Sequence, residues 1–437
     1  MSLPKEDLST SRSRWFVILV SSMLYFIGYF HRVSVTVIVE DLMRDFSVSA
    51  TSLGLFSSLY FYPYAAMQIP AGLLVDSLGP RKMLTCFSLL TSIGSFIFAL
   101  APTFPAAMVG RTILGVGVSV AFLCTAKLIS SWFDVRSFAS LTGVLVSIGN
   151  VGALVASAPL ALMVTNLGWR FSFLLIAAAT LVLTIALWLV VRDSPQEELW
   201  QSCLSPRSST RFRQPLGSGS GVRLAFKSRE FWLTASPPLF FFGTFISLQG
   251  LWGVPYLMQS YGLSRVDASL LVMMISVGFC VGATFWGLVS DRLVFSRRRV
   301  YIFGTALYCF VWALLALLSG GESTAYVLIL FLSLGFSFGV MPVSIVIVKE
   351  LFPKGVMGSV TGSANAFPFI GAALYQLWIG YFLDNFGLLG VIEGVRIFSR
   401  AAYQTSFAIC LGSLLAAMVM VLLIREPREH ATSPGSG

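Results

Sequence analysis

The sequence is poor in charge and in chemically reactive side chains. Only 11% of its 437 residues are charged, and it contains 2 histidines and 6 cysteines. The cysteines lack the spacing of a metal site or a redox pair, so we expect them to be packing residues. The apolar segments hold no paired carboxylates, no His/Cys cluster and no phosphate-binding loop. The sequence therefore predicts a protein that is not an enzyme and that uses no metal or cofactor.

Hydrophobic residues are abundant instead. They make up 56% of the chain, which includes 37 Phe and has a mean hydropathy of +0.84, far above that of a soluble globular protein. The net charge of +10 is compatible with a nucleic-acid partner, but the basic residues form short clusters between apolar runs, as they do in cytoplasmic loops. We therefore predict a multi-pass protein whose surroundings are the lipid bilayer, with no nucleic-acid partner.

Apolar runs of membrane-spanning length occur twelve times. A hydrocarbon core of about 30 Å needs about 20 apolar residues per helix. A basic segment rich in Ser, Gly and Pro separates the runs into two groups of six, so we expect an N-terminal half at 1–192, a cytoplasmic linker loop at 193–229 and a C-terminal half at 230–437. The predicted spans are 15–39, 51–75, 83–102, 106–132, 139–164, 169–191, 231–259, 267–290, 300–319, 324–348, 357–383 and 402–424.

The distribution of Lys and Arg predicts the orientation. With a cytoplasmic N-terminus, 21 of these residues fall in inside segments and 5 in outside loops. We therefore expect both termini to be cytoplasmic, in the cytoplasmic (inner) membrane. The first run, about 24 residues long, has no small-residue cleavage site before its polar end, so it should remain as a transmembrane helix rather than a signal peptide.

The two halves also resemble each other in sequence. A tandem duplication explains such a relation, and parallel six-helix repeats with a substrate site at their shared interface are a known transporter plan. The alternative explanation is that these small residues only allow close helix packing, but packing alone does not require the matches to share one constant sequence offset. The matches, all at an offset of 219, are "SLTG" (140–143) with "SVTG" (359–362), Gly152 with Gly371, Asn166 with Asn385, and Gly168 with Gly387.

A signature follows the second predicted span. "GLLVDSLGPRKML" resembles motif A of the major facilitator superfamily, and "GLVSDRLVFSRRR" after the eighth span repeats part of it. "GRTILGVG" resembles the fourth-helix motif of the same family. The resemblance implies an all-α fold of twelve transmembrane helices in two pseudo-symmetric halves, with the first motif glycine allowing close helix approach and the aspartate latching one conformation. The predicted latch residues are Gly72, Asp76, Arg81, Lys82, Asp291, Arg292 and Arg111, although a structural hydrogen bond is the safer role for Arg111.

The stretch "YFIGYFHRVSVTV" places Arg32 inside the first span. Arginine at the bilayer centre costs roughly 2.5 to 3.5 kcal/mol, so such residues usually face a polar cavity, although this one could also reach the outer interface by snorkelling. A cavity-facing position is favoured by a polar and small stripe at helical spacing, formed by Ser21, Tyr25, Gly28, Tyr29, Arg32 and Thr36.

Other polar residues in the spans each have more than one interpretation. Lys127 is a ligand contact, a snorkelling side chain or a partner in the latch, and His31 is a proton carrier or a packed imidazole. Polar groups of the second half are ligand contacts or hydrogen bonds between helices. The predicted substrate-binding residues are Arg32, Tyr29, Tyr25, Lys127, Gln249, Tyr256 and Asn365, with His31 as the proton-coupling candidate.

A guanidinium facing a cavity binds carboxylate or phosphate oxygens. The first-span segment resembles the anion:cation symporter and organophosphate:phosphate antiporter branches of the superfamily, which place an arginine there. We therefore predict a monomeric secondary transporter of a small organic anion, with a carboxylate favoured because no second central base is evident, working by alternating access and coupled to a proton if His31 titrates. Alternatives are an organophosphate exchanger, a drug or siderophore exporter, and a transporter-like membrane sensor.

Overall fold

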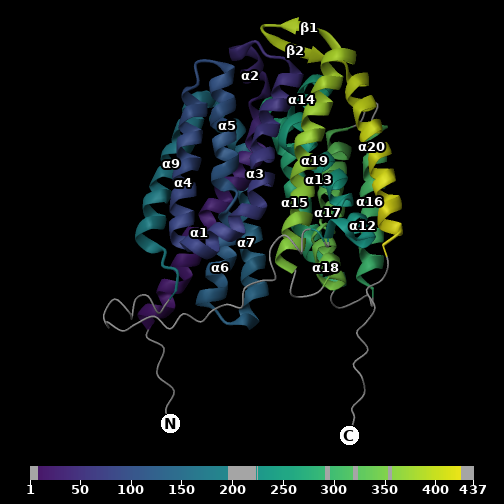
Figure 1. Ribbon diagram of the computed structural model, residues 1–437. Coiled ribbons are helices and arrows are strands. Elements are labelled where there is room, and N and C mark those ends of the chain that lie inside the picture. Colours follow the sequence, from purple (N-terminus) through teal and green to yellow (C-terminus); the bar gives the residue numbers. More distant parts are fainter. Residues whose placement is uncertain are drawn as a thin grey trace, which may run out of the picture.

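The computed structural model describes residues 8–194, 223, 225–290, 296–317, 323–352 and 357–424. The helices form two bundles that stand side by side, and a two-stranded hairpin caps one end (Figure 1). We call the bundle of α1 to α9 the N-terminal half, the bundle of α12 to α20 the C-terminal half, and the end that carries the strands the hairpin end. The opposite end, where α1 begins and α20 ends, is the loop end.

The N-terminal half contains six expected spans built from nine described helical segments and one 3-10 turn. They are α1 (Leu8–Val33), the 3-10 turn η1 (Ser34–Val37), α2 (Val39–Phe46), α3 (Ala50–Leu78), α4 (Pro80–Leu100), α5 (Phe104–Val118), α6 (Ala121–Trp132), α7 (Val135–Val155), α8 (Ala158–Leu167) and α9 (Trp169–Val190).

The C-terminal half repeats this plan and adds the hairpin. Its elements are α12 (Arg229–Ala235), α13 (Pro237–Ser247), the π-helical turn η2 (Leu248–Trp252), α14 (Gly253–Tyr261), α15 (Arg265–Leu288), α16 (Arg297–Ala316), α17 (Thr324–Phe338), α18 (Pro342–Leu351), α19 (Met357–Phe386), β1 (Leu388–Ile392), β2 (Val395–Phe398) and α20 (Arg400–Leu422).

Serine side chains start many of these helices. At these starts the hydroxyl of an N-cap serine, such as Ser49 before α3, accepts a backbone N–H of the first turn, which satisfies one of the donors that a helix start leaves without a partner. The same device recurs along the C-terminal half, at Ser228, Ser264, Ser296, Ser323 and Ser399.

Within the described ranges, eleven helical segments are long and apolar enough to cross a membrane. The remaining expected span corresponds to α3, a 29-residue helix whose apolar character is diluted by tyrosines and by Pro63, Gln68 and Pro70. It stands among the other spans and packs along α19 (Figure 1). The multi-pass, helical membrane fold predicted from the sequence is confirmed.

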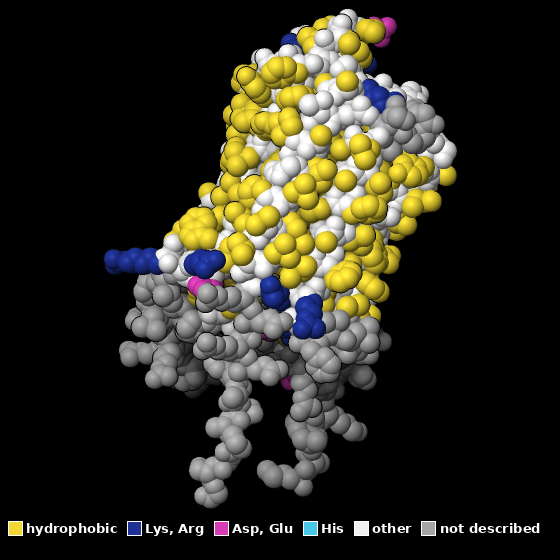
Figure 2. Space-filling model, turned by 90° about the vertical axis from the view of Figure 1, so that its right-hand side faces the viewer, with side chains coloured by type: hydrophobic (Ala, Val, Ile, Leu, Met, Phe, Trp, Pro, Cys, Tyr) yellow, Lys and Arg dark blue, Asp and Glu magenta, His cyan; other side chains and the backbone are white. Residues whose placement is uncertain are grey.

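The outer surface fits a bilayer. Phe303 on α16 is 75% exposed, and Phe310, Leu415 and Val419 on α16 and α20 are also exposed. Figure 2 shows hydrophobic side chains over most of one face, with Lys and Arg confined to its two ends. An apolar belt of this extent would be unstable in water, so it is the lipid-facing surface.

The internal repeat is visible in the packing. A side chain at Gly152 on α7 would meet the backbone of Phe26 on α1, and one at Gly371 on α19 would meet the backbone of Leu239 on α13. The first and fifth spans of each half therefore approach through equivalent glycines. Equivalent packing at one sequence offset supports the duplication.

Two features were not predicted from the sequence. The loop 388–398 forms the antiparallel hairpin β1–β2, with Glu393 and Gly394 at positive φ in its turn. The seventh span contains the π-helical turn η2. Most of the expected linker 193–229 lies outside the described residues.

Candidate functional site

Arg32 lies near the end of α1, between the two halves. Only 5% of it is exposed, so it does not snorkel to an interface. Its guanidinium carbon lies 4.3 Å from the ring centre of Tyr29 and 5.7 Å from that of Tyr64, both in the N-terminal half. The rings of Phe242 and Phe369, at 5.8 and 5.3 Å, come from the C-terminal half. We call these four rings and Arg32 the central cage.

The charge of Arg32 has no carboxylate partner in the described part of the chain. Among the described residues it forms no ion pair, and its Nε atom is buried without a hydrogen-bond partner. Contact with aromatic faces offsets part of the cost of burying a cation but does not satisfy its N–H donors. A planar cation in this condition is suited to bind an anion.

The tyrosines predicted from the helical stripe lie beside this cation. The Tyr25 hydroxyl donates to the Tyr29 hydroxyl at 3.2 Å, and their rings meet edge to face at 4.9 Å. Gly149 on α7 lies directly against both rings, because a Cβ there would come within 2.7 Å of Tyr25. Two predicted binding residues, Tyr25 and Tyr29, are therefore next to Arg32.

Two contacts between α3 and α19 form the loop-end side of the cage. The rings of Tyr64 and Phe369 lie 4.2 Å apart, and one turn further on the Asn365 amide donates to the side-chain oxygen of Gln68 at 2.9 Å. Further towards the loop end, a Cβ at Gly72 would meet no atom of the described chain within 4 Å. Asn365 was predicted, whereas Gln68 was missed, although it continues the i, i+4 series of Tyr60 and Tyr64.

The seventh span meets α1 through its π-helical turn. A Cβ at Gly250 would lie 3.0 Å from the carbonyl oxygen of Arg32. The neighbouring Gln249 points into its own half and donates to the Ser276 hydroxyl at 2.7 Å. Tyr256 is buried with its ring 5.1 Å from that of Phe407, also within the C-terminal half. Of these two predicted contacts, neither belongs to the cage in this conformation.

Lys127 belongs to the latch region. Its Nζ atom lies 2.7 Å from Oδ1 of Asp76 and donates to the carbonyl of Val75 at 3.1 Å. Arg81 donates to the carbonyl of Trp188 at 2.7 Å and lies over its ring at 4.5 Å. The basic residues therefore tie the ends of α3 and α4 to α6 and α9.

The other latch predictions have different outcomes. Lys82 is exposed at the start of α4, and Gly72 does not bring helices close in this conformation, contrary to the expectation for the motif glycine. Asp291 and Arg292 lie outside the described residues. Arg111 is not with the latch. It is fully buried inside the N-terminal half, where Nη1 donates to the carbonyl of His31 at 2.8 Å.

His31 also lies inside the N-terminal half. Its side chain is fully buried, with the ring 5.6 Å from Phe30 and 6.1 Å from Phe173. Neither ring nitrogen has a hydrogen-bond partner among the described residues. The adjacent positions 31 and 32 thus send one side chain into the bundle and the other towards the interface between halves.

At the hairpin end the halves are joined by carboxylates. Asp41 on α2 pairs with Nη1 and Nη2 of Arg265 on α15, at 2.9 and 3.0 Å. Asp384 on α19 accepts the backbone N–H of Thr51 on α3 at 2.7 Å and an N–H of Arg396 at 3.1 Å. Burial raises the pKa of Asp41 above its ordinary value, although Arg265 acts against this. This end is closed between the halves.

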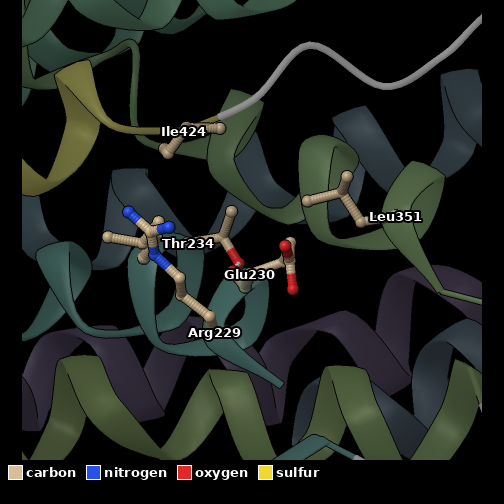
Figure 3. Close-up of a pocket in the computed structure, with 6 residues that line it drawn as sticks. Arg229, Glu230, Thr234, Leu351 and Ile424 are labelled. Carbon is tan, nitrogen blue, oxygen red and sulfur yellow. Dashed lines mark hydrogen bonds between the residues drawn. The ribbon is translucent and has the colours of Figure 1, made fainter.

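A separate small pocket occurs at the loop end of the C-terminal half (Figure 3). It is lined by Arg229, Glu230, Leu233, Thr234, Leu351 and Ile424. Figure 3 shows the Glu230 carboxylate directed away from the Arg229 guanidinium. The pocket lies within one half and shares no residue with the central cage, so it is not the site between the halves.

Comparison with known families agrees with this architecture. The sequence matches the Major Facilitator Superfamily over residues 16–254 and 239–437. The chain belongs to the major facilitator superfamily. The central cage therefore occupies the interface between the two repeats of a superfamily transporter fold, where substrate sites of such folds lie.

Several superfamily members are similar over nearly the whole chain. The probable sulfoacetate transporter SauU of Cupriavidus necator is 24% identical, and the match covers 97% of this chain and 96% of that protein. The hexuronate transporter of Bacillus subtilis is 24% identical over 90% of this chain and 94% of its own. The probable galactarate/D-glucarate transporter GarP of Escherichia coli K12 is 22% identical, with 85% and 89% covered.

Solved structures of superfamily members share the fold. The nucleoside transporter NupG superimposes with a TM-score of 0.72 at 13% identity, covering 93% of this chain and 98% of that one. A bacterial homologue of the human lysosomal transporter Spinster, inward-facing and occupied, gives 0.71 at 16% identity, with 94% and 96% covered.

Proposed function

We propose that this protein is a secondary transporter that moves a small organic anion across the cytoplasmic membrane by alternating access. The observation that carries the proposal is Arg32, a buried cation with no carboxylate partner among the described residues, enclosed by rings from both halves. An anion bound there touches both repeats, so its binding energy can bias their relative position. Similar proteins include transporters named for sulfoacetate, hexuronate and galactarate/D-glucarate, which supports an organic acid as the substrate.

A carboxylate is favoured over a phosphate ester. A dianionic phosphate normally requires a second base, and Lys127 is already paired with Asp76 away from the cage. The amides of Gln68 and Asn365 and the hydroxyls of Tyr25 and Tyr29 suit the neutral polar remainder of a hydroxylated acid. An organophosphate exchanger is the second candidate.

Binding at Arg32 is tested with purified protein. Arg32→Lys keeps the charge but loses the planar fork, so affinity for the organic acid should fall by about 10- to 150-fold, equivalent to about 1.5 to 3 kcal/mol. The measurement is the ligand-dependent shift of the unfolding temperature across a panel of organic acids and phosphate esters. Arg170→Lys, at a partly exposed position beside Trp169 and away from the cage, is the matched control and should bind normally. Equal affinity in both variants would overturn the proposal.

Transport is tested in proteoliposomes. A transporter gives flux with this protein alone, whereas a membrane sensor binds the acid without moving it. We propose proton symport as the mode and His31 as the residue to test. His31→Gln should retain substrate exchange and lose accumulation driven by a pH gradient, while unchanged accumulation would assign the proton to another group.

The same proposal includes the arrangement in the membrane. Residues 1–192 and 230–437 would move as two bodies joined by 193–229, with both termini cytoplasmic and the monomer as the working unit. The excess of Lys and Arg in the predicted inside segments supports this orientation. An impermeant thiol reagent should label a cysteine placed in 193–229 only after the cells are permeabilised.

A further inference from the structure

Arg111 is a second buried cation, separate from the central cage. It lies on α5 inside the N-terminal half and has no exposed surface. Arginine stays charged at any pH a protein experiences, so this charge is permanent. Burial of a cation requires compensation by an opposite charge or by hydrogen bonds to all of its donors.

No acidic side chain of the N-terminal half supplies that compensation. Among the described residues Arg111 forms no ion pair. Every acid in the sequence up to Arg192 lies before α1, on the short helix α2, in the last turn of α3 or at the start of α7: Glu6, Asp7, Glu40, Asp41, Asp45, Asp76 and Asp134. The interior of this half is positively charged.

The contacts of Arg111 use only part of its donor capacity. Nη1 donates to the carbonyl of His31 at 2.8 Å, in the last turn of α1, where helix carbonyls lack partners within the helix. The guanidinium carbon lies 4.7 Å from the ring centre of Tyr60 and 5.7 Å from that of Phe56. Aromatic faces attract the charge but accept no conventional hydrogen bond from the in-plane N–H groups.

The unused donors form one edge of the guanidinium. Nε and Nη2 are both buried and have no hydrogen-bond partner among the described residues. The N–H bonds of these two atoms run in parallel, and this edge is the fork with which arginine holds an anion. His31, whose carbonyl Arg111 contacts, is also fully buried with both ring nitrogens unpartnered within the described part of the chain.

We propose that the N-terminal half contains an internal site for a small inorganic anion of halide size, held by the Nε and Nη2 edge of Arg111. A monovalent anion cancels the buried charge and satisfies two donors at once. A water molecule satisfies the donors but leaves the charge, and a bulky organic acid does not suit an interior filled by Phe30, Phe56 and Phe173.

This site differs from the central cage in the elements that surround it and in the role of its anion. Arg32 meets rings of both halves, whereas the polar and aromatic contacts of Arg111 with described residues are made to α1 and α3 of one half. The anion therefore stabilises the N-terminal half and the end of α1 that carries Arg32. It is not the transported substrate, and it should bind whether or not the cage is occupied.

Halide titration tests the proposal. The unfolding temperature of purified protein is measured as chloride or bromide replaces gluconate at constant ionic strength, in an Arg32→Gln background so that gluconate has no cage to bind. We expect the halide to raise it by about 2 °C or more. The rise should vanish in Arg111→Gln and persist in Arg170→Gln, the control. The same halide response with and without Arg111, or no response at all, would overturn the site.

Crystallography gives an independent readout if Arg111→Gln does not fold. Crystals of the otherwise unaltered protein grown in bromide should show an anomalous peak beside Nε of Arg111. A featureless map there, with bromide visible elsewhere, would contradict the proposal, and a peak that vanishes at low bromide would show an adventitious ion only. Loss of substrate binding in Arg32→Lys does not bear on this outcome, so failure of the two proposals can be distinguished.

Discussion

The carboxylate of Asp384 on α19 accepts the backbone N–H of Thr51 at 2.7 Å, and thereby caps the first turn of α3 in the opposite half. It also accepts the N–H of Ala50 at 3.1 Å and the Thr51 hydroxyl at 2.6 Å. A carboxylate at a helix N-terminus satisfies free donors and interacts favourably with the helix dipole. These bonds exist only while the hairpin end is closed.

Asp384→Asn should therefore favour opening at the hairpin end. Loss of a charged hydrogen bond corresponds to about 1.5 to 3 kcal/mol, or a shift of about 10- to 150-fold in the ratio of open to closed protein. Spin labels at the exposed positions Val109 and Leu389 would report a longer distance distribution. Asn385→Ala is the control, since Asn385 bonds to the Tyr381 carbonyl of its own helix. An unchanged distribution in Asp384→Asn would show that the cap does not hold the halves together.

Closure of the hairpin end should depend on pH through α2. Burial is the largest cause that raises the pKa of Glu40 and of Asp41 in the closed state, and Arg265 opposes it for both. A carboxyl whose pKa is higher in the closed state takes up a proton on closing. Closure should therefore be favoured as pH falls from above the raised pKa towards the ordinary values of 4.5 and 3.8.

The double variant Glu40→Gln, Asp41→Asn tests this direction of the pH dependence of closure. It removes both titrating groups, so the same spin-label distances should become less dependent on pH. A hairpin end that opens on acidification in the unaltered protein would show that loss of the Asp41–Arg265 ion pair outweighs relief of burial.

The Gln68–Asn365 hydrogen bond predicts the level at which α3 and α19 must separate to open the loop end. Substrate can leave towards that end only if α3 and α19 part at this level, next to Tyr64 and Phe369. A short thiol-reactive linker between Gln68→Cys and Asn365→Cys should abolish transport, and reductive release should restore it. Either single cysteine variant treated with the linker is the control. Continued flux in the cross-linked protein would place the exit elsewhere.

Asp76→Asn should slow exchange without weakening equilibrium binding. Asp76 is highly exposed and its partner Lys127 partly so, and exposed pairs of this kind contribute about 0.2 to 1 kcal/mol. The variant should remain folded and bind the organic acid normally, while single-turnover exchange becomes slower. Lys127→Gln should behave in the same way. If Lys127→Gln alone lost affinity for the organic acid, Lys127 would be a substrate contact rather than only the partner of Asp76.

The sequence predicted most of the fold because hydropathy and charge distribution are local signals. Arg32 was also predictable, since the stripe of Tyr25 and Tyr29 identifies its helix face. Whether Lys127 pairs with Asp76 could not be decided, because the partners lie 51 residues apart and snorkelling fits the same sequence.

The remaining differences arise from contacts between distant segments. Asp384 and Thr51 are 333 positions apart, and no local pattern specifies that a carboxylate caps a helix of the other half. The orientation of His31 follows from packing against Phe173. Motif resemblance predicted a latch role for Arg111, whereas in the structure Arg111 donates to the His31 carbonyl. The hairpin 388–398 was not predicted because its strands, LLGVI and VRIF, are short and carry no sustained alternation of apolar and polar residues.

The contact between Gly250 and the carbonyl of Arg32 joins two spans through their backbones. Side chains can change rotamer and slide, whereas backbone atoms at this distance can only turn about one another. The contact can therefore act as a fulcrum between the two halves. Arg32 lies 18 residues from Arg14, the start of its span, which is about 27 Å, so a tilt of about 20° about the contact moves that end by about 9 Å. One end approaches the opposite half as the other withdraws, and a larger side chain at position 250 would displace the pivot itself.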